Sequence, residues 1–147
     1  MISLQTLSKL WLLNNGFSGP NYLYWDQSMI KQIKSSEIKK FVENNPKTVL
    51  LDVRTDDEWK TIGKPDTKNL GIKTFFITIG QNPSFIDSVK KEINKENQIL
   101  VMCAAGGRSI IAANLLQNEG YKVNNISDGF SGNGQDLGWK NSGLPTN

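Results

Sequence analysis

Short apolar runs alternate with amphipathic stretches from residue 29 to the end of the chain. The runs TVLLDV (48–53) and QILVMC (98–103) are mainly aliphatic, which is typical of strands that are covered on both faces. The segments MIKQI (29–33) and YKVNNI (121–126) predict two more strands, and TFFITI (74–79) is either a further strand or a buried loop. The pattern therefore predicts a sheet of short strands.

Helices are predicted between these strands. Apolar residues recur at helical spacing on one side of 35–45 and of 82–94, and the segment 107–120 is largely apolar and ends at a glycine. A short helix begins after Thr55, because Thr55 and Glu58 have the spacing of a capping box. Each predicted helix thus lies between two predicted strands.

Strands that alternate with helices indicate an α/β fold with a central, mainly parallel sheet and helices on both faces. In such sheets the reactive groups lie at the carboxyl ends of the strands. Asp52 and Cys103 are both at such ends, so we expect them at the same edge. We assign this domain to residues 29–147. Residues 1–28 carry little charge and form an N-terminal extension whose role the sequence leaves open.

Composition narrows the chemistry that this domain can perform. The chain of 147 residues contains one cysteine and no histidine. A single cysteine cannot form an intramolecular disulfide, which fits a reducing compartment. Without histidine the usual Cys–His and Ser–His catalytic pairs and most zinc sites are excluded. We therefore expect neither a metal nor a cofactor.

Charge and hydropathy argue against two classes of partner. The formal net charge of +3 comes from scattered lysines, whereas nucleic-acid binders concentrate basic residues in a stripe. No apolar run approaches the length of a membrane span, and the run LWLL near the start lacks a basic leader and a cleavage site. We expect a cytoplasmic protein that binds neither nucleic acid nor membrane.

The stretch CAAGGR (103–108) has the features of a reactive-thiol loop. Cys103 ends a predicted strand, and Gly106 and Gly107 permit a turn whose N–H groups point inward at the start of a helix. With no histidine to remove the thiol proton, these N–H groups and the helix dipole must lower the thiol pKa. Arg108, one of only two arginines, could grip an oxyanion with its planar fork. The alternative is that Cys103 is a small buried hydrophobe beside an ordinary turn.

Residues after the strand 48–53 could support this site. Asp52 could accept hydrogen bonds from loop N–H groups, or it could be a plain carboxylate that faces solvent. Arg54 and Glu58, four residues apart around the capped turn, could pair and brace the same edge in a structural, not a catalytic, role. Three aromatic side chains are expected in the core or at its rim: Trp59, Phe130 and Trp139.

Three stretches resemble the rhodanese (sulfurtransferase) domain: LLDVRTDDEW, ILVMCAAGGRSIIAANLLQNEGYKVNNISDGFSG and GWKNSGLP. The resemblance covers roughly residues 30 to 145 and implies a rhodanese-like α/β domain in which Cys103 carries sulfur as a persulfide. The substrate-binding cradle that it implies consists of Ala104, Ala105, Gly106, Gly107 and Arg108. Many relatives have an arginine directly after the cysteine, so Ala104 removes one contact to an anion.

The function implied is transfer of sulfane sulfur from a small anionic donor such as thiosulfate to cyanide, a thiol or a carrier protein. The acceptor must be external, because the chain has no second cysteine. Two alternatives stay open. One is a cysteine phosphatase or arsenate reductase of related fold, whose loop between cysteine and arginine is one residue longer. The other is an interaction module with an unreactive cysteine.

Overall fold

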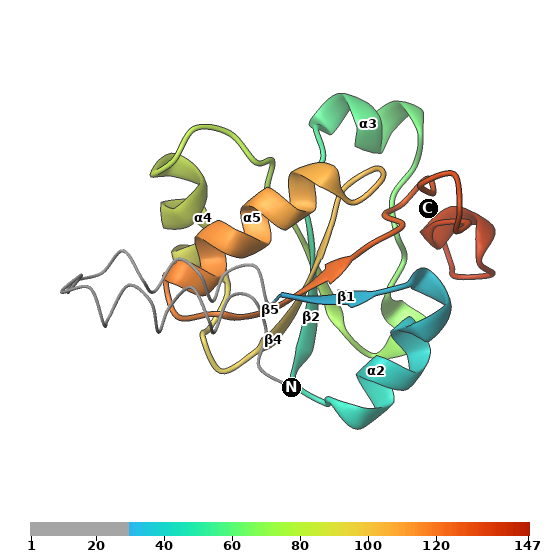
Figure 1. The fold of residues 1–147 in the computed structure, drawn as a ribbon, viewed down its shortest axis with the longest axis horizontal. Helices are drawn as coiled ribbons and strands as arrows, with labels where there is room; N and C mark the ends of the chain where they lie inside the picture. The colour runs from blue at the N-terminus through green and yellow to red at the C-terminus, as the bar shows by residue number, and fades with distance from the viewer. Residues whose placement is uncertain (1–29) are drawn as a thin grey trace, which may run out of the picture.

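The computed structural model describes residues 30–147, so the expectation for residues 1–28 lies outside the described part of the chain. Five parallel strands form one sheet in the order β1-β5-β4-β2-β3 (Figure 1). The strands are β1 (Lys31–Ile33), β2 (Thr48–Asp52), β3 (Lys73–Phe76), β4 (Gln98–Met102) and β5 (Lys122–Ile126). The predicted parallel sheet is confirmed, and the segment 74–79 contributes a strand.

Helices cover both faces of this sheet, as predicted. The helices are α2 (Ile38–Asn44), α3 (Asp56–Thr61), α4 (Ser84–Glu92) and α5 (Gly107–Asn118). Within residues 30–147 these helices are accompanied by the 3₁₀ turns η2 (Ser35–Glu37), η3 (Lys68–Leu70) and η4 (Trp139–Asn141). Figure 1 shows α4 and α5 on one face of the sheet and α2 on the other, whereas α3 lies beyond one end of the strands.

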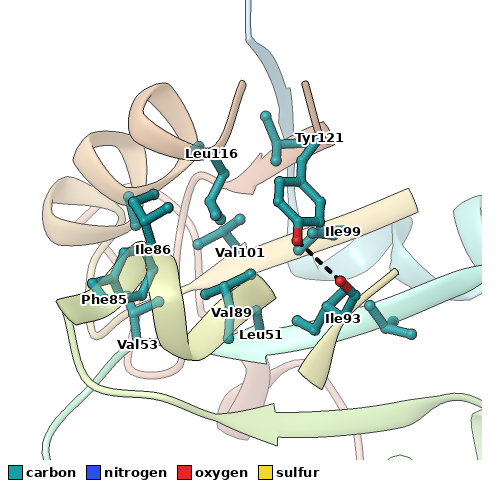
Figure 2. Close-up of a cluster of buried hydrophobic side chains, with 14 of the residues drawn as sticks. Leu51, Val53, Phe85, Ile86, Val89, Ile93, Ile99, Val101, Leu116 and Tyr121 are labelled. Carbon is teal, nitrogen blue, oxygen red and sulfur yellow. Dashed lines mark hydrogen bonds between the residues drawn. The ribbon is translucent and has the colours of Figure 1, made fainter. Parts of the chain in front are cut away.

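Side chains of the strands alternate between two buried clusters, as the pleat of a strand requires. The cluster beneath α4 and α5 includes Leu51, Val53, Ile99, Val101 and Cys103. The cluster beneath α2 includes Leu50, Leu100, Met102, Phe130 and Trp139. Figure 2 shows the first of these, where the Tyr121 hydroxyl donates to the Ile93 carbonyl at 3.0 Å. Cys103 therefore belongs to the face that α5 covers.

The predicted helix at 35–45 is two elements, η2 followed by α2. Both the backbone N–H and the hydroxyl of Ser35 donate to Asp128 Oδ1 at 2.9 Å. Asp128 is 93 positions later in the chain and lies just after β5. The start of this segment is therefore held by a tertiary contact that no local pattern reveals.

Candidate active site

The single cysteine lies at the carboxyl edge of the sheet. Cys103 follows β4, is 1% exposed, and begins the loop that leads into α5. Strand β2 pairs with β4, and Asp52 at its end lies opposite Met102. The predicted meeting of the two strand ends is thus confirmed.

The Cys103 sulfur is surrounded by hydrogen-bond donors from its own loop and from α5. The backbone N–H of Gly106 donates to Sγ at 3.2 Å, and the Ser109 hydroxyl lies 3.3 Å from the same atom. Ser109 is fully buried in the first turn of α5. The sequence analysis did not select this residue, although a hydroxyl in the first helical turn after the loop is a signal that could have revealed it.

These contacts lower the pKa of the Cys103 thiol below its ordinary value. Burial is the largest single influence and acts in the opposite direction, because it disfavours the charged thiolate. The Ser109 hydroxyl and the backbone N–H groups of Ser109, Ala105 and Gly106 together outweigh the burial. The thiol is therefore activated by hydrogen-bond donors, without a histidine.

A second loop, residues 127–131 after β5, donates hydrogen bonds to carbonyl groups of the cysteine loop. The Phe130 N–H donates to the Cys103 carbonyl at 2.8 Å, and the Ser131 N–H donates to the Ala104 carbonyl at 2.9 Å. Between the two loops, Gly129 has a φ of 59°, and a Cβ added there would overlap both of these carbonyl groups. Only glycine permits this close approach of two backbones.

Gly106 is required for a similar reason. Its φ is 99°, and an added Cβ would overlap the Ser127 carbonyl. The carbonyl of Gly106 accepts a hydrogen bond of 3.2 Å from the Asn125 amide on β5. Since loop carbonyls are engaged with these neighbours, N–H groups of the loop remain available to the sulfur.

Arg108 does not present a free guanidinium. Its two terminal nitrogens donate to the two carboxylate oxygens of Glu58, at 2.6 and 2.8 Å. The hydrogen bonds from Arg108, reinforced by those from Thr55, lower the pKa of Glu58 to about 2 even though burial opposes the shift. In this structure the fork that we expected to grip an oxyanion is thus occupied by a carboxylate that stays ionised at any moderate pH.

The predicted pair between Arg54 and Glu58 is wrong. Arg54 precedes the N-cap Thr55, so it lies outside α3 and the spacing rule for helical neighbours does not apply to it. Its side chain is fully buried, donates to both carboxylate oxygens of Asp52, and lies over Phe130, with 4.0 Å between the guanidinium carbon and the ring centroid.

Asp52 is fully buried as well, so the expectation of a solvent-facing carboxylate is also wrong. The backbone N–H that it accepts comes from Arg54 at 3.1 Å and not from the cysteine loop. The ion pair of Asp52 and Arg54 is therefore structural and lies beneath the site.

Relatives of known sequence identify the family. The family described as STR4 middle domain matches residues 30–147. Uncharacterized protein RP600 of Rickettsia prowazekii is 42% identical over 122 residues, which are 80% of this chain and 97% of the relative. Thiosulfate sulfurtransferase 18 of Arabidopsis thaliana is 30% identical over 82% of this chain and 92% of its own length. The chain belongs to the rhodanese-like domain family.

Solved structures agree with this membership. The rhodanese-like domain has a TM-score of 0.69 with Rv0390 from M. tuberculosis, at 27% identity over 80% of this chain and 96% of that one. A rhodanese-like domain protein from Staphylococcus aureus gives a TM-score of 0.56 at 21% identity, over 80% of this chain and 99% of the other. The second likeness shows the shared fold alone.

The described residues of the rhodanese-like domain do not offer a metal site. Within residues 30–147 no three His, Cys, Asp or Glu side chains gather in a way that could hold a metal ion. In the same range, no helix is both long and apolar enough to cross a membrane. The Cys103 sulfur instead lies among hydrogen-bond donors, the Gly106 N–H and the Ser109 hydroxyl.

Proposed function

We propose that this protein is a sulfurtransferase that moves sulfane sulfur through a persulfide on Cys103. The supporting observation is the environment of the sulfur atom, which is buried and faces the Gly106 N–H and the Ser109 hydroxyl. Donors in these positions favour a thiolate, which is the nucleophilic form of cysteine. The same donors suit the terminal sulfur of a persulfide, because this atom is also anionic.

The reaction has two displacement steps. In the first, the Cys103 thiolate attacks the outer sulfur of a donor such as thiosulfate. A sulfur–sulfur bond forms on Cys103, the sulfur–sulfur bond of the donor breaks, and sulfite leaves with the bonding electron pair. In the second, cyanide or a thiolate attacks the terminal sulfur of the persulfide and regenerates the Cys103 thiolate. The acceptor is external because the chain has no second cysteine, and the cytoplasm, where thiols are kept reduced, supplies one.

The site gives less support to the alternatives. A phosphatase needs a free guanidinium for the phosphoryl oxygens, whereas both terminal nitrogens of Arg108 are engaged with Glu58. Only four residues separate Cys103 from Arg108, which leaves a narrower loop than a phosphatase uses. An interaction module with an inert cysteine would have an ordinary thiol, and here the pKa of Cys103 is lowered.

Intact-mass spectrometry of the reduced protein tests the proposal. The protein is incubated with thiosulfate or with a small alkyl persulfide, and the Cys103→Ser variant is treated in parallel. We expect the wild-type protein to gain the mass of one sulfur atom and to lose it on addition of cyanide, whereas the variant gains nothing. A wild-type protein that takes up sulfur from neither donor, or a variant that takes it up equally well, overturns the proposal.

A further inference from the structure

One ion pair lies beside the cysteine loop and affects the charge that a bound sulfur-donor molecule meets there. From Cys103 to Arg108 the only charged side chain is Arg108. Its salt bridge to Glu58 is bidentate, and the side chains are 40% and 20% exposed. The pair is therefore at the surface beside the loop, where it adds no net charge.

Glu58 is held in this position by the start of its own helix. Its carboxylate oxygen Oε1 accepts the Thr55 hydroxyl at 3.0 Å and the Thr55 N–H at 3.3 Å, and its own N–H donates to the Thr55 hydroxyl at 3.2 Å. These are the reciprocal bonds of a capping box. The carboxylate is thus built into α3, so it does not move aside without loss of the helix cap.

We propose that Glu58 is a specificity residue that makes the site favour sulfur donors of low charge over dianions. This inference rests on the proposed function. A thiolate that attacks thiosulfate brings negative charges together, and the Arg108 charge that would offset them is neutralised by Glu58. An alkyl persulfide carries at most one negative charge, and its protonated form, which the thiolate attacks, carries none.

The step with this preferred donor is a simple displacement. The Cys103 thiolate attacks the outer sulfur of the alkyl persulfide, and a new sulfur–sulfur bond forms while the bond in the donor breaks. The alkyl thiolate leaves with the electron pair, and the proton of the donor remains on the new persulfide. Neither an oxidant nor a reductant is required.

Rapid-mixing measurements of Cys103 persulfidation test this proposal in the full chain. The rate constants for thiosulfate and for a small alkyl persulfide are compared in the wild type and in Glu58→Gln. Glutamine is also used at this position of a capping box, so the variant keeps the cap and removes the charge. We expect the ratio of the thiosulfate rate to the persulfide rate to rise about tenfold in the variant, which corresponds to about 1.4 kcal/mol of activation free energy. The ratio is decisive because a change in thiol reactivity alters both rates alike.

Two further variants complete the test. Glu37→Gln removes one negative charge from another helix start, and it should leave the ratio unchanged. In the double variant Glu58→Gln with Arg108→Gln the gain should disappear, because the released cation is absent. An unchanged ratio in Glu58→Gln, or a gain that survives in the double variant, overturns the role of Glu58. Absence of persulfidation with both donors would instead refute the proposed function.

Discussion

At Cys103 a serine takes the place that a histidine occupies in many thiol enzymes. The Ser109 hydroxyl is buried with the sulfur and can donate to the thiolate, but it cannot accept the thiol proton as a base at neutral pH. The site thus stabilises the ionised form of the thiol and leaves the removal of its proton to solvent. A small set of backbone and hydroxyl donors is sufficient for this purpose, because each one favours the anion.

The variant Ser109→Ala should raise the thiol pKa, because the largest contribution that opposes burial is removed. Alkylation of Cys103 by iodoacetamide, followed against pH, should shift to higher pH and slow severalfold at neutral pH. Ser88→Ala is a matched control, since the Ser88 hydroxyl donates to a carbonyl within α4, in an exposed position. An unshifted profile in Ser109→Ala would show that the hydroxyl does not stabilise the thiolate.

Residue-level prediction from sequence succeeded where the signal was local. The position of Cys103 and the need for Gly106 follow from a strand end and a sharp turn, which are both visible in the sequence. The partners of Arg54 and Glu58 could not be predicted in this way. Arg54 donates to the buried Asp52, and Glu58 accepts from Arg108, which is 50 positions away in the chain. Such choices depend on tertiary contacts that the spacing of charges does not contain.

At the scale of elements, the loop after β5 determines the shape of the cysteine loop. The carboxylate of Asp128 accepts hydrogen bonds from Ser35 before α2 and from the Gly138 N–H before η4. This one side chain therefore ties the start of α2 and the C-terminal segment to the loop that supports Cys103. The sequence predicted the strands and helices, but the contact between Ser35 and this distant carboxylate is not visible in the pattern of the segment 35–45.

The variant Gly129→Ala should lower the free energy of unfolding by more than the positive φ of Gly129 alone would cause. Its added Cβ would overlap the carbonyl groups of Cys103 and Ala104, so we expect a loss of about 3 kcal/mol or more in the free energy of unfolding. Gly143→Ala is the matched control, because Gly143 also has a positive φ but no atom lies within 4 Å of an added Cβ. It should cost about 1–2 kcal/mol. Urea unfolding measures both, and equal losses would contradict the close approach at Gly129.

At the scale of the whole molecule, the ion pair of Glu58 and Arg108 joins two elements that flank the site. Glu58 belongs to α3 and Arg108 to the first turn of α5, and Figure 1 shows α3 beyond the end of the sheet near which α5 begins. The pair therefore couples the local charge of the site to the stability of the fold. We therefore expect the protonation of Glu58 to change the stability of the whole domain.

Acid should remove the stabilisation that this pair provides. The pKa of Glu58 is lowered from 4.5 to about 2 in the folded protein, so its contribution is fully present above pH 4.5 and is lost as the pH falls towards 2. The wild type should therefore have a higher Tm than Glu58→Gln near neutral pH, and the difference should shrink between pH 4.5 and pH 2. Thermal unfolding followed by circular dichroism measures this difference. A difference that does not depend on pH would mean that the charge of Glu58 does not stabilise the fold.

The backbone contacts between the two loops also limit how far the cysteine loop can change its conformation. Carbonyl groups at Cys103, Ala104 and Gly106 are held by neighbouring donors, so the loop cannot reverse these peptide units without breaking hydrogen bonds. If Cys103 takes up a sulfur atom as proposed, we expect these hydrogen bonds to keep the backbone of the loop in place. On the proposed function, an acceptor would then have to recognise the added sulfur atom itself, because the surrounding backbone would look the same with and without it.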